Sequence, residues 1–278
     1  MTDFRDEAAQ LVRSLRAYVE WQAETGAHGI PRVGKQGGRL GQGLGLGQPA
    51  GATAVRQEPE PSPTPPAHVE APKTPTAPIV QLDRHVRLPQ MAQEVAGCTK
   101  CGLSATRNKT VFSRGNPEAA LMFIGEAPGA DEDEQGLPFV GKAGQLLDRM
   151  IAAMGLDPER DVYICNIVKC RPPENRRPLP EEMSSCFPFV NEQIDLVAPK
   201  VIVAMGNTAV AAMLDTKLGI TRLRGQWKLY RGRIPLMPTY HPSYLLRPSP
   251  QQLEAKRQAW DDLQAVMKEL GLSLPKKA

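Results

Sequence analysis

The chain has 278 residues, of which 41% are apolar, and its formal net charge is +4. This length is enough for one sizeable domain with additional segments. No run of about 18 apolar residues occurs, which argues against a membrane-spanning helix. The first ten residues, MTDFRDEAAQ, are acidic rather than basic and then apolar, unlike a signal peptide. We therefore expect a cytoplasmic protein that does not associate with membranes.

The first third of the chain differs in composition from the rest. Residues 1–29 carry apolar side chains at helical spacing before Gly26, which predicts a short amphipathic helix. Residues 34–51 then contain eight glycines, and residues 49–78 contain nine prolines. Such a segment cannot bury enough apolar surface to offset its ordering entropy. We therefore predict a disordered linker over 30–84.

From residue 85 onward, apolar strand-like runs alternate with helical patterns. The predicted strands are LMFIG at 121–125, VYICNIV at 162–168, KVIVAMG at 200–206 and IPLMPTY at 234–240. The predicted helices cover 143–155, 179–199, 207–215 and 250–270, with Asn207 and Ser249 as caps and a break or bend near Pro188. This pattern predicts one domain, 85–278, with a mainly parallel sheet in a three-layer α/β/α fold.

The residues that directly follow these strands are the candidate site, because ligands of parallel sheets bind outside the carboxyl ends of the strands. They are Gly125–Gly129, Asn166–Arg171, Gly206–Asn207 and His241–Ser243. Glycines beside Glu126 would let a ligand approach the main-chain N–H groups closely. Taken singly, Asn166 is more often a turn former, His241 a structural residue and Phe139 a core aromatic. No phosphate-binding glycine pattern is present.

Five cysteines indicate a reducing compartment, where clustered cysteines bind metals or act in redox chemistry more often than they form disulfides. Cys98 and Cys101 form a CxxC pair, and Cys170 and Cys186 follow the second predicted strand. Four thiolates suffice for tetrahedral zinc or for an iron–sulfur cluster, and the wide spacing of the second pair favours the cluster. Four unrelated buried thiols are the alternative, and mid-strand Cys165 is expected to be a core residue.

Charge is distributed unevenly along the chain. No acidic residue occurs between Asp215 and Glu254, a stretch with seven cations: Lys217, Arg222, Arg224, Lys228, Arg231, Arg233 and Arg247. Seven cations without a counter-charge indicate a face for a polyanion. A solvated basic surface would explain the same pattern, so charge alone does not decide between them.

Five motifs occur together in the order typical of one known family. They are the paired cysteines, GEAPG at 125–129, PFVGKAGQLL at 138–147, NIVKCRPPENRRP at 166–178 and HPSYLL at 241–246. Over roughly residues 90–270 the chain resembles the family-4 uracil-DNA glycosylases, the iron–sulfur class. The resemblance implies the uracil-DNA glycosylase fold. It also implies a monofunctional DNA N-glycosylase that flips uracil out of DNA and hydrolyses its N-glycosidic bond, initiating base excision repair.

The resemblance also implies a role for each strand-end residue. Phe139 would stack on the extruded base, and Asn166 would read its Watson–Crick edge. The main chain at Gly125, Glu126 and Ala127 would hold uracil O2. His241 would stabilise the uracil anion as it leaves, which is an oxyanion-hole role.

One loop departs from the better-known branch of the superfamily, which reads Gly-Gln-Asp-Pro-Tyr-His here. The water-activating Asp of that branch aligns with Ala127, and its thymine-excluding Tyr aligns with Gly129. Glu126 is the first candidate for a replacement base and Glu132 the second. The remaining nearby acids are expected to form a solvated turn.

Further implications concern the cofactor and the partners. Cys98, Cys101, Cys170 and Cys186 would bind a structural [4Fe–4S] cluster. Arg171, Arg176 and Arg224 would bind DNA phosphates, and Leu245 or Leu246 would fill the gap left by the flipped base. The implied partner is uracil-containing DNA. We expect a monomer, whose N-terminal helix is a candidate contact for other repair or replication proteins.

Two alternative functions are compatible with parts of this pattern. A uracil-capturing relative bonds covalently to the sugar and carries a basic loop ending in His after the second strand, but RPPENRRPLP has no His. An iron–sulfur DNA-binding module without turnover would make Asn166 and His241 dispensable.

Overall fold

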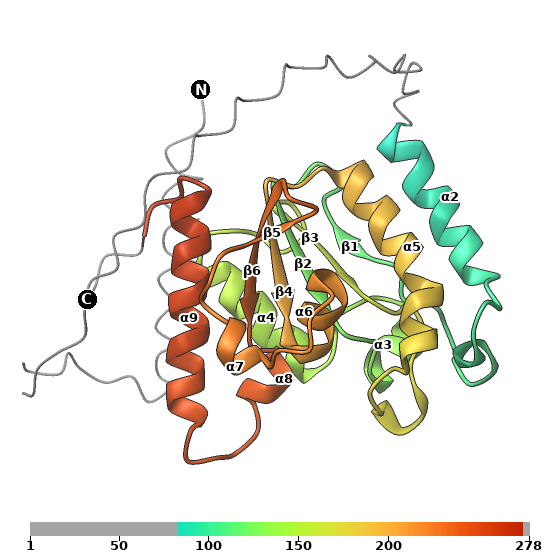
Figure 1. Ribbon diagram of the computed structural model, residues 1–278. Helices are drawn as coiled ribbons and strands as arrows, with labels where there is room; N and C mark the ends of the chain where they lie inside the picture. The colour runs from blue at the N-terminus through green and yellow to red at the C-terminus, as the bar shows by residue number, and fades with distance from the viewer. Residues whose placement is uncertain (1–82, 275–278) are drawn as a thin grey trace, which may run out of the picture. The chain divides into compact units, whose positions relative to one another are not determined.

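A parallel sheet forms the centre of the described part of the protein (Figure 1). The computed structural model describes residues 83–274, so the predictions for 1–29 and for most of 30–84 lie outside it. Within this range, six strands follow the order β1-β3-β2-β4-β6-β5. The parallel strands are β2 Leu121–Gly125, β3 Val162–Asn166, β4 Val201–Met205 and β6 Ile234–Thr239. Two short antiparallel strands, β1 Arg114–Gly115 and β5 Lys228–Tyr230, form the edges.

Helices cover both faces of this sheet, as predicted. They are α2 Arg84–Ala96, α3 Ala130–Gln135, α4 Lys142–Ala153, α5 Pro180–Val197, α6 Gly206–Leu214, α7 Ile220–Leu223, α8 Pro242–Leu245 and α9 Gln252–Glu269. Short 3-10 turns lie at Gly102–Ala105 and Pro173–Asn175. No helix within residues 83–274 is both long enough and apolar enough to cross a bilayer.

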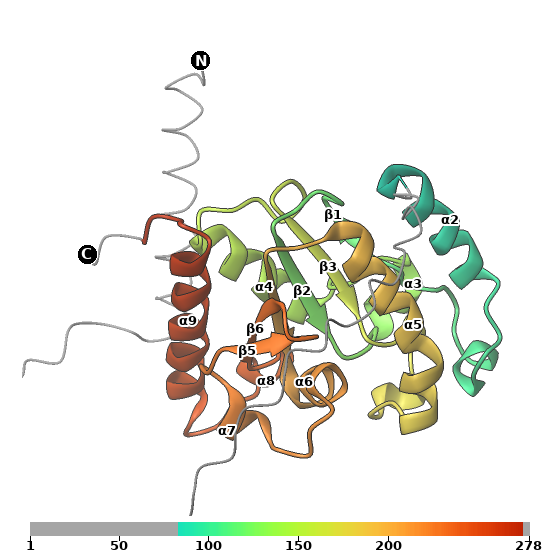
Figure 2. The same ribbon diagram turned by 45° about the horizontal axis from the view of Figure 1, so that its top comes forward.

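Two hydrophobic cores flank the sheet because successive side chains of a strand point to opposite faces. Leu121 and Phe123 pack with α4, α8 and α9, whereas Met122 and Ile124 pack with α2, α5 and α6. Figures 1 and 2 show α9 on one side of the sheet and α5 and α2 on the other. This arrangement confirms the predicted three-layer α/β/α fold.

The register of the central strands brings their carboxyl ends to the same level. Gly125 of β2 pairs with Asn166 of β3, so the two strands end at the same level. The β4 strand ends at Met205 beside Thr239 of β6. The carboxyl ends of all four parallel strands therefore meet at one edge of the sheet.

Two predicted helix caps are wrong, and so is the alternative of a helix break near Pro188. Asn207 lies inside α6, and its side chain accepts a hydrogen bond from Ile220 N at 3.1 Å instead of capping the helix. Ser249 does not cap α9, because that helix begins after Gln251. Helix α5 runs without interruption through Pro188. Its buried face packs on the core along the helix, which offsets the hydrogen bond that proline removes.

The prediction of a solvated acidic turn after β2 is also wrong. Residues Ala130–Gln135 form helix α3, in which Asp133 is buried. Its carboxylate accepts hydrogen bonds from Asn108 N at 2.9 Å and Asn108 Nδ2 at 2.8 Å. This acid therefore fastens the segment before β1 to the loop after β2. Helix α2 was also not predicted, although Leu88, Met91 and Val95 follow a helical spacing.

The basic stretch 217–247 does not form one face, because distant acids neutralise part of it. Arg224 pairs with the buried Asp262 of α9, and its guanidinium also donates to Gln258 O. Arg231 and Arg233 both pair with Asp195 of α5. These last two residues flank the β5–β6 turn, at the end of the sheet opposite the carboxyl edge of β6.

We predict that the Asp262 pair contributes far more to stability than the Asp195 pair. Asp262→Ala should lower the free energy of unfolding by about 3–5 kcal/mol, because it leaves a mostly buried guanidinium without a counter-charge and removes the acceptor of the Thr239 hydroxyl. The matched exposed variant, Asp195→Ala, should cost less than about 1 kcal/mol. Urea denaturation of the two variants measures the difference, and equal losses would contradict it.

Candidate active site

A pocket of about 570 Å³ lies at the carboxyl edge of the sheet. Its walls come from the segments that follow the parallel strands: Glu126–Gly129 after β2, Asn166 at the end of β3, Gly206 and Asn207 after β4, and Tyr240 and His241 after β6. Phe139, from the loop between α3 and α4, completes it. The pocket therefore lies at the strand ends, where the sequence predicts the site.

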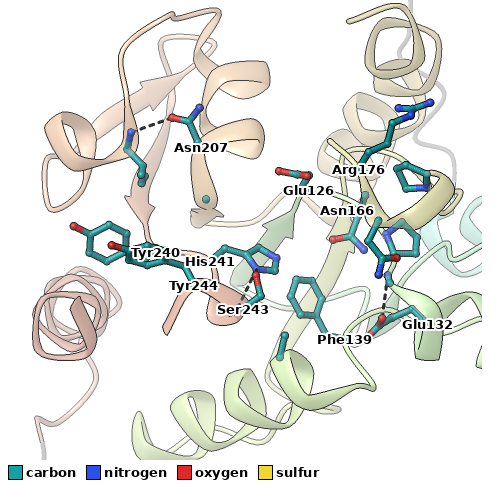
Figure 3. Close-up of a pocket in the computed structure, with 18 of the residues that line it drawn as sticks. Glu126, Glu132, Phe139, Asn166, Arg176, Asn207, Tyr240, His241, Ser243 and Tyr244 are labelled. Carbon is teal, nitrogen blue, oxygen red and sulfur yellow. Dashed lines mark hydrogen bonds between the residues drawn. The ribbon is translucent and has the colours of Figure 1, made fainter. Parts of the chain in front are cut away.

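Three of the predicted site residues, Phe139, Asn166 and His241, line this pocket and are drawn close to one another in Figure 3. The rings of Phe139 and His241 have centroids 5.6 Å apart at an interplanar angle of 32°. A Cβ atom on Gly125 would lie 2.5 Å from Phe139 Cζ and would also collide with Asn166 Oδ1. The absence of a side chain at Gly125 therefore allows the ring and the amide to approach each other.

The backbone at Phe139 is held in a conformation that is uncommon for a bulky residue. Its φ is 57°, in the left-handed region. Arg114 donates to Pro138 O at 2.9 Å on one side, and Glu132 accepts from Val140 N and Gly141 N at 2.9 Å on the other. These bonds fix the loop so that the aromatic ring faces the pocket.

The amide of Asn166 offers the pocket an unpaired acceptor. The residue is 1% exposed, and its Oδ1 is buried without a hydrogen-bond partner in the described structure. Buried polar atoms almost always have a partner, since leaving one unsatisfied costs about 1–3 kcal/mol. An orphaned oxygen at the end of a strand, facing a pocket, indicates that a ligand supplies the missing donor.

The imidazole of His241 presents its Nε2 as a donor. Two groups of Ser243 lie against Nδ1: the main-chain N–H at 3.2 Å and the hydroxyl oxygen at 2.8 Å. Because an N–H can only donate, we infer that Nδ1 carries a lone pair and that the neutral ring carries its proton on Nε2. Burial, and then the charge of Arg247, lower the pKa of His241 from 6.5 to about 4. The ring is therefore neutral at physiological pH and still able to donate a hydrogen bond.

The two candidate bases lie in different environments. The Glu132 carboxylate accepts three main-chain hydrogen bonds, from Gly129 N at 3.0 Å and from Val140 N and Gly141 N. It therefore connects the loop after β2 to the loop of Phe139. Glu126 also lines the pocket, and Figure 3 shows its carboxylate at the rim above Asn166.

Of the five predicted DNA-contacting residues, Arg176 is the one that lines the pocket. It pairs with the buried Glu182 at 2.6 Å, and Arg171 donates to Asn175 at 2.8 Å. Leu245 is fully buried in the core, and Leu246 packs against the same core. Neither leucine is an exposed wedge in this structure.

Several pocket residues were not singled out as site residues from the sequence. Tyr244, in the motif that contains His241, is 40% exposed at the rim, and its ring packs on Tyr240 with centroids 5.1 Å apart. Arg247 also lines the pocket. Both residues lie in the segment after β6, and this position was the sequence feature that could have identified them. Arg114 lies far from the motifs in sequence, and only its contacts reveal its role.

The four predicted metal-binding cysteines line a second, smaller pocket on the α2 and α5 side. Cys98 and Cys101 follow α2, Cys170 follows β3, and Cys186 lies on α5. All five cysteines are free thiols, and Cys165 packs in the core outside this pocket, as predicted. Within residues 83–274, no three His, Cys, Asp or Glu side chains are grouped closely enough to hold one metal ion. The four thiols instead surround a space.

Hydrogen bonds hold these cysteines in place. Arg107 donates to Cys98 O at 2.7 Å and to Cys170 Sγ at 3.2 Å, and Lys169 N donates to Cys186 Sγ at 3.3 Å. Burial raises the pKa of the Cys170 thiol, and it raises the pKa of Cys186 to about 11. Donors to sulfur and nearby cations favour the thiolate forms that ligate metals.

Comparison with known proteins agrees with the fold and the strand-end pocket. The family model described as "Uracil DNA glycosylase superfamily" matches residues 112–264, which is more than half of the chain. This range contains β2 to β6 and all the residues that line the larger pocket, whereas Cys98 and Cys101 of the second pocket precede it. The fold and the match together define a protein of the uracil DNA glycosylase superfamily.

Individual relatives narrow this assignment. The "Type-4 uracil-DNA glycosylase" of Thermotoga maritima is 46% identical over 158 residues, covering 56% of this chain and 82% of the relative. A protein with the same description from Sulfurisphaera tokodaii is 44% identical over 168 residues, covering 57% of this chain and 76% of the relative. Another, from Saccharolobus solfataricus, is 43% identical over 164 residues, covering 56% of this chain and 76% of the relative. The chain therefore belongs to the type-4 uracil-DNA glycosylases, which confirms the resemblance seen in the sequence.

We predict that His241 keeps its neutral Nε2–H form from pH 8 down to about pH 5. The folded-state pKa is lowered to about 4, so the proton binds only below that range. Nitrogen-15 NMR of histidine-labelled protein measures both the tautomer and the titration. A midpoint near 6.5, or a proton on Nδ1, would contradict the geometry described here.

Proposed function

We propose that the strand-end pocket binds a uracil extruded from DNA. The single observation that carries this proposal is the unpaired, buried Oδ1 of Asn166. Uracil N3–H would donate to this oxygen, and uracil O4 would accept from the Asn166 amide nitrogen. On cytosine the donor and the acceptor at these two positions are exchanged, so neither hydrogen bond forms. A site built this way can discriminate against the wrong ligand by a factor of about 10⁴–10⁵. The Phe139 ring would stack on the base.

The proposed reaction is hydrolysis of the bond between uracil N1 and deoxyribose C1′. The electron pair of this bond stays with uracil, so negative charge develops on the base and positive charge on the sugar. Nε2–H of the neutral His241 would donate to uracil O2, where the negative charge gathers. A preorganised donor of this kind is typically worth about 10²–10³ in rate.

The attacking water needs an acceptor for its proton, and Glu126 is the better candidate. The carboxylate of Glu132 is occupied by three main-chain N–H groups, as shown above. Glu126 lines the pocket from the same loop. A carboxylate at this position would also stabilise the positive charge on the sugar.

We also propose that Cys98, Cys101, Cys170 and Cys186 bind a [4Fe–4S] cluster. Four thiols around a space fit a multinuclear group better than one zinc ion, whose four sulfur ligands would converge about 2.3 Å from a single point. When bound, the cluster would supply structural cross-linking, joining the end of α2 to β3 and α5. The proposed hydrolysis needs no electron transfer.

The partners follow from the same proposal. The substrate would be uracil-containing DNA, whose phosphates Arg171 and Arg176 would contact beside the pocket. Arg224 is less suited to this role, because Asp262 and Gln258 occupy its guanidinium. We expect a monomer in the cytoplasm, where the free thiols would stay reduced. The proposed contact of segment 1–29 with other proteins remains a sequence prediction.

An oligonucleotide assay tests this function. The full-length protein should convert a strand with one uracil into an alkali-labile strand, and Asn166→Asp should weaken its preference for uracil over cytosine. The aspartate offers only acceptors, so it no longer donates to O4. Gel analysis after alkali measures both, with a thymine strand as the control.

Two other outcomes of this assay would contradict the proposal. A protein–DNA adduct that survives denaturant would indicate covalent capture. Binding without strand breakage, unaffected by Asn166→Asp, would indicate a DNA-binding module without turnover.

We predict that iron content depends on the cysteines of the second pocket and not on the fifth cysteine. Cys170→Ser should lose most of its iron, because an alcohol replaces a thiolate ligand. Cys165→Ser is the matched control and should retain it, since Cys165 lies outside this pocket. Colorimetric iron and zinc analysis of the purified proteins makes the measurement. Zinc in place of iron in the wild type would contradict the cluster assignment.

A further inference from the structure

A buried lysine lies between the two pockets. The side chain of Lys169 is 0% exposed, and the residue directly precedes Cys170. Its Nζ donates to the main-chain oxygen of Asn166 at 2.8 Å and to Gln193 Oε1 at 2.5 Å. Its main-chain N–H donates to Cys186 Sγ at 3.3 Å. One residue therefore contacts both the end of β3 that carries the base-reading amide and a predicted cluster ligand.

The surroundings of this ammonium contain hydrogen-bond acceptors but no carboxylate partner. Within residues 83–274, the ion pairs of the structure do not include Lys169. The Phe112 ring lies 5.7 Å from Nζ. Lys169 instead lines the second pocket together with the four cysteines, so the groups near it that can become anionic include thiols. A buried cation is costly unless an anion balances it.

We propose that Lys169 is a positioning residue that links substrate recognition to the iron–sulfur cluster. This inference rests on the proposed function. The negative charge of a cluster held by four thiolates would balance the buried ammonium. In turn, the ammonium would hold the Asn166 carbonyl and thereby fix the amide that reads uracil.

The network around Gln193 supplies a matched control. Gln193 accepts from Lys169, and its amide donates to Tyr163 OH at 3.0 Å and to Phe112 O at 3.3 Å. Gln193 is also fully buried, but its described hydrogen bonds do not include Asn166 or a cysteine. Gln193→Leu therefore disturbs the same buried network while keeping the cation and its bond to Asn166.

The experiment compares Lys169→Met with Gln193→Leu in the full-length, iron-loaded protein. Two readouts separate positioning from general stability: the reduction potential of the cluster, and inhibition of strand cleavage by free uracil. In Lys169→Met the potential should move to more negative values, because a buried positive charge that favours the reduced cluster is lost. Inhibition by uracil should weaken, and kcat should fall about tenfold, with KM for DNA little changed.

The control should lower thermal stability without shifting either readout. If Lys169→Met matched Gln193→Leu in both potential and uracil inhibition, the positioning role would be refuted. If Lys169→Met does not fold, Lys169→Arg keeps the charge and moves the donors. It should leave the potential near that of the wild type and weaken inhibition by uracil. The opposite pattern would overturn the inference.

Failure of this inference can be distinguished from failure of the proposed function. A wild-type protein that neither cleaves uracil-containing DNA nor contains iron would refute both. A wild-type protein that does both, with Lys169→Met equal to the control, would refute only the role of Lys169.

Discussion

The site depends on the missing side chain at Gly125. At the end of β2, the space that a Cβ atom would fill is occupied by the Phe139 ring and the Asn166 amide. Because Gly125 is in register with Asn166, any side chain there would separate the two groups. A second glycine serves the same purpose in the next wall of the pocket. Gly206 has φ of +88°, and a Cβ there would lie 2.9 Å from His241 Cβ. Backbone without side chains therefore lets three functional groups surround one small volume.

Burial determines the chemistry of the groups that surround this volume. Helices cover both faces of the sheet, so polar groups at the ends of its strands are shielded from solvent. The consequences differ with the group: the amide oxygen of Asn166 lacks a partner, and the imidazole of His241 stays neutral. Lys169 shows a third consequence, a cation without a carboxylate in its described surroundings. Each of these states costs free energy in the protein without ligands. The proposed uracil would bind Asn166 and His241, and the proposed cluster would balance the charge of Lys169.

Charge in this protein is organised by pairs that are distant in sequence. Arg224 pairs with Asp262, and Arg231 and Arg233 pair with Asp195. The buried Asp262 connects the Arg224 segment to α9, so this guanidinium is not free to contact a phosphate. Fewer cations than the sequence suggested therefore remain for phosphates, and Arg247 is one that lines the pocket.

Sequence by itself determined the four parallel strands, their alternation with helices, and the segments that line the pocket, but not the edge strands β1 and β5 or the order of strands in the sheet. These features depend on local patterns, namely apolar runs, periodicity and strand-end motifs, which are readable wherever they occur. Tertiary structure decided how the side chains are used. Only packing showed that Glu132 clamps two loops, that Leu245 is buried, that Arg224 is neutralised by Asp262, and that Lys169 lies between two pockets. These contacts join residues far apart in the chain, and no local pattern records which partner a charged side chain will meet once the chain folds.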